Sequence, residues 1–366
     1  MVSDPIHSND RTETAAAGQS AMGAVIDALE HAVVSGDPAA FEAAVGPVQQ
    51  ALQGAGPAEA AEAGPRLAGL LGEVPAWPRA FLAVMTGACV ERGADPLACA
   101  GPILGGTRRA LEAALLLTEL WKRTGGGELP DPEQDDPGEA MARLGGPASP
   151  RAERAVTGWW TVHLWEMAAN AVLAHAPVRL SAAAHGVREV LLELASSYGE
   201  VGPEMKCLVH SAKTLDDEPL LVLHRPTGTG YRLRMSGLTD TFQLHTLLAD
   251  VLIGGGHLPG TAPDPEVVAV SRDTDLAPGR RLLTGGSFNL VAMDGTWIWN
   301  EGAPIDIPVV DGIRILVLDP PPYERSWPAG RLIPAIAGDL VLERVLPAAE
   351  AAALLAKAAP GSQFGQ

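Results

Sequence analysis

Three polar side chains recur along one face of an otherwise apolar, tryptophan-rich stretch of the sequence. His163, Glu166 and Asn170 stand at positions i, i+3 and i+7, which places them on one side of a helix. Burying an imidazole, a carboxylate and an amide is costly unless they are paired. Two interpretations follow: His163 and Glu166 are metal ligands or an acid/base pair, or the stripe is a hydrogen-bonded network or a water-facing groove between domains.

A second concentration of chemically useful side chains lies in two loops, residues 299–302 and 319–328. They combine tryptophan, tyrosine, carboxylate and guanidinium groups in a chain with only 4% aromatic residues. Such side chains bury much area at a small entropic cost, so they are common in binding sites. The residues predicted to bind, at an exposed rim, are Glu301, Tyr323, Arg325 and Trp327. The alternative is structural: the prolines stiffen a connection, and Tyr323 and Trp327 cover the sheet edge or the core.

The familiar catalytic and cofactor motifs are missing from the sequence. It contains no Gly-x-Gly-x-x-Gly after a strand, no Walker A sequence, no Gly-x-Ser-x-Gly, no His-Glu-x-x-His and no Cys-x-x-Cys. No cofactor-binding residue is therefore identified, and the cofactor stays unknown. A lone histidine on a helix, such as His245, is more typical of a surface or core position than of a ligand.

Composition restricts the classes of partner and the location. A net charge of −18 argues against nucleic acid, and the chain lacks an apolar run of about 18 residues, which argues against a membrane. Three cysteines without metal-site spacing, and a start with no apolar signal segment, predict a cytoplasmic protein. Only four of the 26 basic residues are lysine, a bias that indicates a GC-rich bacterial genome.

Periodic apolar residues then divide the chain into segments that must position these groups. Residues 1–20 read as a flexible tail and 21–123 as a helical domain. Pro38, Pro57, Pro78 and Pro96 stand at intervals of about twenty residues, each just before a helical pattern. This spacing fits either a solenoid of helical hairpins or an ordinary bundle.

The middle of the chain is predicted to contain a linker and then central helices. Residues 124–150 carry six acidic residues among glycines and prolines, so they read as an acidic linker or mobile loop. Residues 151–218 return to helical patterns, including one helix over 181–197. The stretch with Trp159, Trp160 and Trp165 is apolar around most of its circumference, which predicts a helix at the centre of the molecule.

Beyond residue 218 the apolar period changes from 3.6 to two, which predicts an α+β domain over 219–360. Its strands are joined by hairpins, so we expect an antiparallel or mixed sheet with flanking helices. Asp294-Gly295 and Asp311-Gly312 are both strong signals for a two-residue hairpin turn.

A two-residue turn at Asp294-Gly295 fixes which side chains share a face. It pairs Ala292 with Trp297 and Leu290 with Trp299. The residues expected on one face are Phe288, Leu290, Trp297 and Trp299. We expect both tryptophan rings to pack into the core, because an open patch of this kind is rare on a monomer.

These observations predict an α+β protein whose N-terminal part is all-α and possesses helical hairpins. The predicted function is that of a non-catalytic binding or scaffold protein that recognises a peptide, a protein or a small ligand. The alternative is an acid/base or metal-assisted enzyme that uses His163 and Glu166 near Glu301 or Glu324.

Overall fold

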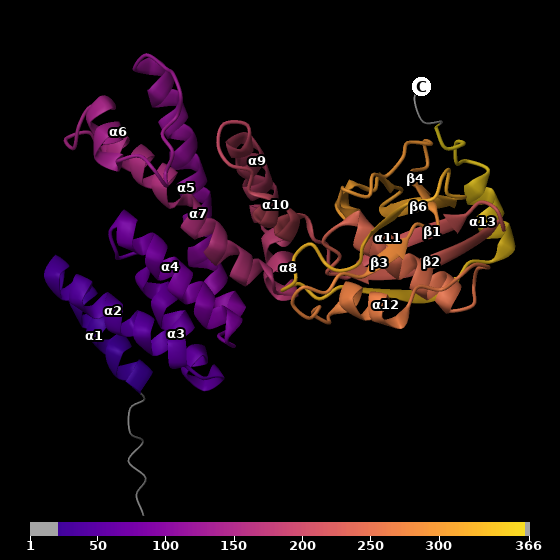
Figure 1. The fold of residues 1–366 in the computed structure, drawn as a ribbon, viewed down its shortest axis with the longest axis horizontal. Helices are drawn as coiled ribbons and strands as arrows, with labels where there is room; N and C mark the ends of the chain where they lie inside the picture. The colour runs from indigo at the N-terminus through magenta and orange to yellow at the C-terminus, as the bar shows by residue number, and fades with distance from the viewer. Residues whose placement is uncertain (1–20, 363–366) are drawn as a thin grey trace, which may run out of the picture.

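The computed structural model describes residues 21–362, and the predicted tail over residues 1–20 lies outside the described residues. Within these residues, ten helices come first, and a mixed sheet with further helices follows (Figure 1). This order confirms the predicted α+β class with an all-α N-terminal part. Among the described residues, no helix is both long enough and apolar enough to cross a membrane.

The helical part shares one hydrophobic core that extends from Met22 to Ala212. Its helices are α1 (Ala21–Ser35), α2 (Pro38–Gly54), α3 (Pro57–Leu70), α4 (Ala76–Glu91), α5 (Pro96–Arg123), α6 (Pro137–Arg143), α7 (Pro150–Leu173), α8 (Ala176–Ala184), α9 (Val187–Gly199) and α10 (Lys206–Lys213).

Prolines begin several of these helices, as predicted. Pro38, Pro57 and Pro96 stand at the first position of α2, α3 and α5, where a missing N–H costs nothing. Pro78 instead lies inside the first turn of α4. The solenoid interpretation of this spacing stays a prediction.

The tryptophans of α7 are buried, as the sequence predicts for a central helix. Trp159, Trp160 and Trp165 are between 2% and 6% exposed. The helix predicted over 181–197 is wrong as a single element, because the chain breaks between α8 and α9. Gly186 provides the break with a φ of 69°, a conformation that glycine adopts readily.

The acidic segment 124–150 contains structure that the sequence did not predict. It includes the short helix α6, which Asp136 caps through a hydrogen bond from the Gly138 N–H at 2.7 Å. The indole N–H of Trp121 and that of Trp159 each donate to a backbone oxygen of this segment at 2.8 Å. The segment is therefore held against α5 and α7, and the domain boundaries around it stay a prediction.

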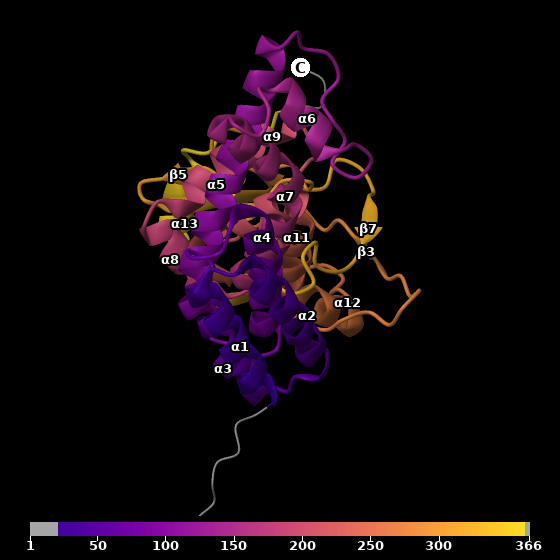
Figure 2. The same cartoon turned by 90° about the vertical axis from the view of Figure 1, so that its left-hand side faces the viewer.

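The α+β part is built on one mixed sheet with the strand order β4-β6-β1-β2-β8, and β5 pairs with β6. Strands β1 and β6 are parallel, whereas the remaining pairs are antiparallel. Strands β3 and β7 form a separate two-stranded sheet. Figure 2 shows these two strands on one side of the molecule, away from α13.

Helices cover both faces of the main sheet. Leucines of α11 pack on one face, and α13 packs on the other. The elements are β1 (Glu218–His224), β2 (Thr229–Ser236), α11 (Thr241–Ala249), a π-helical turn η1 (Asp250–Gly254), α12 (Pro265–Arg272), β3 (Leu283–Gly285), β4 (Asn289–Val291), a 3₁₀ turn η2 (Pro304–Asp306), β5 (Val309–Val310), β6 (Ile313–Asp319), β7 (Ser326–Pro328), β8 (Asp339–Val345) and α13 (Ala348–Leu355).

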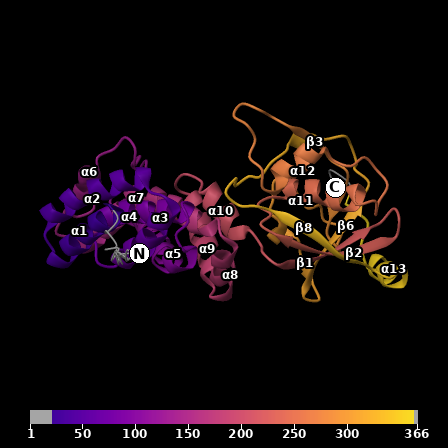
Figure 3. The same ribbon diagram turned by 90° about the horizontal axis from the view of Figure 1, so that it is seen from below.

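The two parts of the chain meet at α8 and α10, as Figure 3 shows from below. Arg179 on α8 forms a buried, two-pronged ion pair with Asp216, with N–O distances of 2.6 and 2.8 Å. On α10, the Nδ1 atom of His210 lies 2.9 Å from the backbone oxygen of Thr239. These contacts connect the helical core to the start of the sheet.

The two Asp-Gly turns differ in register. At Asp311-Gly312 both residues have positive φ, and Val310 pairs with Ile313 as in a two-residue hairpin. At Asp294-Gly295 only the glycine has positive φ, and Val291 pairs with Trp297. This is the longer turn with a bulge at the glycine, so the register is shifted by one residue.

The predicted shared face of Phe288, Leu290, Trp297 and Trp299 is therefore wrong. A shift of one residue moves side chains to the opposite face of a strand. Trp297 is half-buried with Val291 on the α13 side, whereas Phe288 and Leu290 belong to the core on the α11 side. The expected packing of both rings is also wrong, because Trp299 is 61% exposed.

Candidate binding pocket

The four side chains that the sequence predicts for binding line one pocket in the α+β part. The pocket has a volume of about 240 Å³. Its lining residues are Phe242, Trp297, Ile298, Trp299, Asn300, Glu301, Tyr323, Arg325, Ser326 and Trp327. The structure thus brings together two loops that are separated by some twenty residues of chain, and their role in binding stays a prediction.

Strands of both sheets position the walls of this pocket. The loop after the β4 hairpin contains Trp299 to Glu301, and the N–H of Gly302 closes it by donating to the oxygen of Trp299 at 3.1 Å. The segment before β7 provides the opposite wall. Its Arg325 donates through Nη2 to the backbone oxygen of Phe288 at 2.7 Å, which connects this segment to the start of β4.

The rim of the pocket is aromatic and its floor is buried. Trp299 and Tyr323 are 61% and 50% exposed. Trp327, which we predicted at the exposed rim, is instead only 5% exposed. Its ring lies against two residues of α11, 5.2 Å from the Phe242 ring centroid and 4.9 Å from that of His245. Because α11 lies far from Trp327 in the sequence, the prolines next to Trp327 could not indicate which helix its ring packs against.

His245 lies behind Trp327 and is fully buried, which places it in the core rather than on the surface. Its Nε2 atom accepts the backbone N–H groups of Ser287 and Phe288, at 2.9 and 3.1 Å. Burial, together with the nearby charge of Arg325, lowers the pKa of His245 to about 3. The ring is therefore neutral at pH 7, and because Nε2 accepts, the proton resides on Nδ1.

Several buried polar atoms around the pocket have no hydrogen-bond partner. They belong to residues that line the pocket or to α11 directly behind it, and each atom is closed off from solvent. They are Thr241 Oγ1, His245 Nδ1, Asn300 Oδ1, Arg325 Nε and Trp327 Nε1. A buried polar group without a partner costs about 1–3 kcal/mol, and native proteins contain few of them. Their concentration around one pocket is the signal that sequence reasoning missed.

The polar stripe of α7 lies elsewhere. His163 is exposed, and Glu166 is half-buried and accepts the N–H of Leu208 at 3.4 Å. Burial raises the pKa of Glu166. Neither residue lines the pocket that contains Glu301.

Within residues 21–362, no group of three or more His, Cys, Asp or Glu side chains is arranged to hold a metal ion. The enzyme alternative with His163 and Glu166 stays a prediction. The metal content of the purified protein, compared with that of a Glu166→Gln variant, tests it.

Comparison of the chain with models of known protein families, with curated proteins and with solved structures gives no match.

Proposed function

We propose that this protein is a non-catalytic binding protein, and that the pocket between residues 299–301 and 323–327 holds a polar organic ligand or a peptide segment. The observation that carries the proposal is the set of unpartnered polar atoms around an aromatic-lined pocket. A bound polar molecule supplies partners for such groups after small side-chain movements.

The size of the pocket favours a small occupant. Pockets for drug-sized ligands usually measure about 300–1,000 Å³, whereas this one measures about 240 Å³. It therefore suits a molecule of the size of an amino acid or one side chain of a peptide. The pocket also contains one acidic and one basic side chain, Glu301 and Arg325, so it suits an occupant with both an amine and a carboxylate.

The first experiment tests binding directly. The probe is the free dipeptide Gly-Phe, which carries an amine, a carboxylate and a ring, and its acetylated amide serves as the uncharged comparison. We expect saturable binding of the free form by ligand-observed NMR. A Trp299→Ala/Tyr323→Ala variant should bind at least tenfold more weakly, since aromatic rim residues commonly dominate such contacts.

A matched control separates binding from folding. Trp77 on α4 is also exposed but lies outside the pocket, so Trp77→Ala should leave binding unchanged. If the rim variant unfolds and loses binding only in proportion to its folded fraction, the rim is structural and the proposal fails.

The second experiment needs no ligand. Replacing Thr241 by valine removes a buried hydroxyl without a partner while keeping the shape of the side chain. We expect the free protein to become more stable by about 1 kcal/mol in urea denaturation, because the desolvated hydroxyl is gone. A loss of stability would show that the hydroxyl is already paired in the free protein, and the main support for the proposal would disappear.

A further inference from the structure

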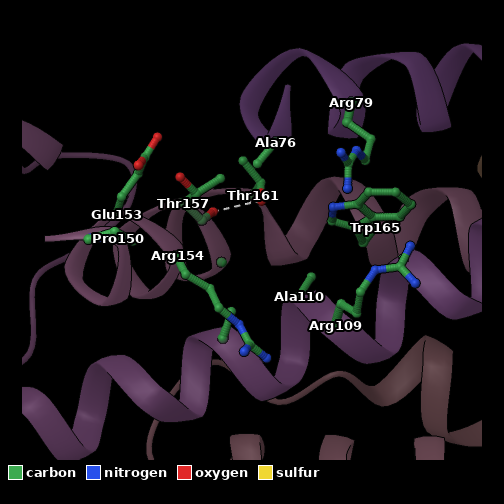
Figure 4. Close-up of a pocket in the computed structure, with 13 residues that line it drawn as sticks. Ala76, Arg79, Arg109, Ala110, Pro150, Glu153, Arg154, Thr157, Thr161 and Trp165 are labelled. Carbon is green, nitrogen blue, oxygen red and sulfur yellow. Dashed lines mark hydrogen bonds between the residues drawn. The ribbon is translucent and has the colours of Figure 1, made fainter. Parts of the chain in front are cut away.

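The helical part contains a second pocket, between α4, α5 and α7, with a volume of about 310 Å³ (Figure 4). Its lining residues are Ala76, Arg79, Gly106, Arg109, Ala110, Ala113, Pro150, Glu153, Arg154, Thr157, Gly158, Thr161 and Trp165. It shares no residue with the pocket of the α+β part.

Small residues create the space. A Cβ atom on Gly106 would lie 2.0 Å from the Trp165 ring, and one on Gly158 would lie 2.4 Å from the Cβ of Ala113. Helices α5 and α7 therefore approach closely only because these positions lack side chains. The pocket that remains above this contact has an apolar base of glycine, alanine and Trp165.

Basic side chains surround this apolar base, in a chain whose net charge is −18. Arg154 pairs with Glu112 at 3.3 Å, so its charge is partly compensated. Arg79 donates through Nε and Nη2 to the backbone oxygen of Val74, at 2.9 and 2.7 Å, and forms no ion pair with any residue of 21–362. Figure 4 shows Arg79 and Arg109 on opposite sides of the Trp165 ring.

Arg109 makes no hydrogen bond or ion pair with the described part of the chain, although its side chain lines the pocket. Burial and the neighbouring charge of Arg109 lower the pKa of Arg79. Two like charges at one pocket repel each other, and a bound anion offsets this repulsion. Glu153 is the acidic residue of the lining, so the three arginines still leave the pocket positive.

A buried hydroxyl adds a hydrogen-bond donor. Thr157 is 5% exposed, lines the pocket, and its Oγ1 atom has no hydrogen-bond partner. The Thr161 hydroxyl, by contrast, is paired, since it donates to the Thr157 backbone oxygen at 2.7 Å. Thr157 therefore has an unused donor in the wall of the same pocket.

We propose that this pocket binds a small organic oxyanion, a phosphate monoester or a carboxylate on a flat apolar body. Arg79 and Arg109 pair with the oxyanion, the Thr157 hydroxyl donates to it, and the apolar body lies over the small residues of α5 and α7. This site is independent of the pocket in the α+β part.

The test uses one ring system with three head groups. Full-length protein is titrated by isothermal calorimetry with 2-naphthyl phosphate, 2-naphthoate and the uncharged 2-naphthol. We expect saturable binding of at least one of the two anions with a Kd below about 1 mM, and binding of 2-naphthol at least tenfold weaker. The two anions distinguish a phosphate site from a carboxylate site. Binding should also weaken as salt rises, because exposed charges are screened.

Variants test the assigned residues without relying on folding alone. Arg109→Gln should weaken anion binding about tenfold or more, since a hydrogen bond to a charged group is lost. Arg123→Gln on the same helix is the matched control, because Arg123 is exposed and lies outside the pocket. Thr157→Val should also weaken anion binding, yet it should not lower the melting temperature, because the hydroxyl has no partner in the free protein.

Three results would overturn the proposal. The first is no binding of either anion up to 10 mM, a concentration chosen to be about tenfold above the expected Kd limit. The second is equal binding of 2-naphthol and the anions, which would show a purely apolar site. The third is wild-type affinity in both Arg109→Gln and Thr157→Val, which would place the bound anion elsewhere.

Discussion

The same dipeptide, Asp-Gly, joins two hairpins of the sheet and produces two different turns. At Asp311-Gly312 both residues adopt positive φ, 50° and 82°, and the strands pair directly across a two-residue turn. At Asp294-Gly295 the aspartate keeps a negative φ, and the N–H of Gly295 donates to the oxygen of Ala292. The second turn is one residue longer, and every following side chain is on the other face.

The surroundings of each turn explain the difference. Around Gly312, a Cβ atom would meet nothing within 4 Å, so local preference alone determines the turn. Around Gly295, the C-terminal segment packs closely, and the N–H of Ser362 donates to the Gly295 oxygen at 2.9 Å. The dipeptide Asp-Gly predicts a hairpin, but tertiary contacts determine which of two turns of similar energy forms.

The largest expected effect is the difference in stability loss between alanine variants of Gly295 and Gly312. Both have positive φ, so replacing Gly312 by alanine should destabilise the protein by about 1–2 kcal/mol. A Cβ atom on Gly295 would also lie 2.3 Å from the Pro360 carbonyl oxygen. Gly295→Ala should therefore cost at least about 3 kcal/mol. Urea denaturation measures both, and equal losses would contradict the tertiary explanation.

The next effect is a pH dependence of stability that arises from His245, which anchors the segment before β4 through the N–H groups of Ser287 and Phe288. The pKa of His245 is about 3 in the folded protein and about 6.5 in the unfolded chain. Between these values the unfolded chain binds one more proton, so stability falls as pH falls. We expect a loss of about 2 kcal/mol between pH 6.5 and 4.5.

The control for this effect is His245→Gln, which keeps an acceptor for the two N–H groups but cannot titrate. The stability of this variant should fall less over the same pH range. The difference between its pH profile and that of the wild type gives the contribution of His245, separate from that of the carboxylates. Identical pH profiles would show that His245 does not account for the loss.

The smallest effect is the difference in stability between variants of Trp297 and Trp299, which follow the turn at Asp294-Gly295. Trp297 is half-buried against the α13 side of the sheet, so Trp297→Ala should cost about 2 kcal/mol. Trp299 is 61% exposed, so Trp299→Ala should cost less than about 1 kcal/mol. Thermal or urea unfolding of the two variants provides the measurement. Equal costs would contradict the difference in burial between the two rings, whose centroids lie 6.4 Å apart.

Periodicity predicted the helical part well because a helix determines its own faces. The burial of Trp159, Trp160 and Trp165 follows from an apolar pattern that local hydrogen bonds hold in register. The class of the sheet was predicted, but not the register of the hairpin at Asp294-Gly295. That register depends on a segment near Pro360, which no local pattern connects to the turn.

The two pockets also differ in how far the local sequence predicts them. Glu301, Tyr323 and Arg325 were identified as a group because their residue types are concentrated in two short loops. The pocket with Arg79 and Arg109 was not predicted, since its space results from glycines and alanines on helices far apart in the sequence. Glycine and alanine are common in helices, so they indicate a pocket only when the packing of the neighbouring helices is known.

The parallel pairing of β1 with β6 has a consequence for synthesis of the chain. Leu220 of β1 pairs with Arg314 of β6, about ninety residues later, and translation adds roughly 5–20 residues per second. The β1–β2 hairpin therefore leaves the ribosome several seconds before β6 and β8, so both of its edges are unpaired during that time. During that interval the helical part can already be folded, so the nascent sheet is the stage most exposed to aggregation and most dependent on chaperones.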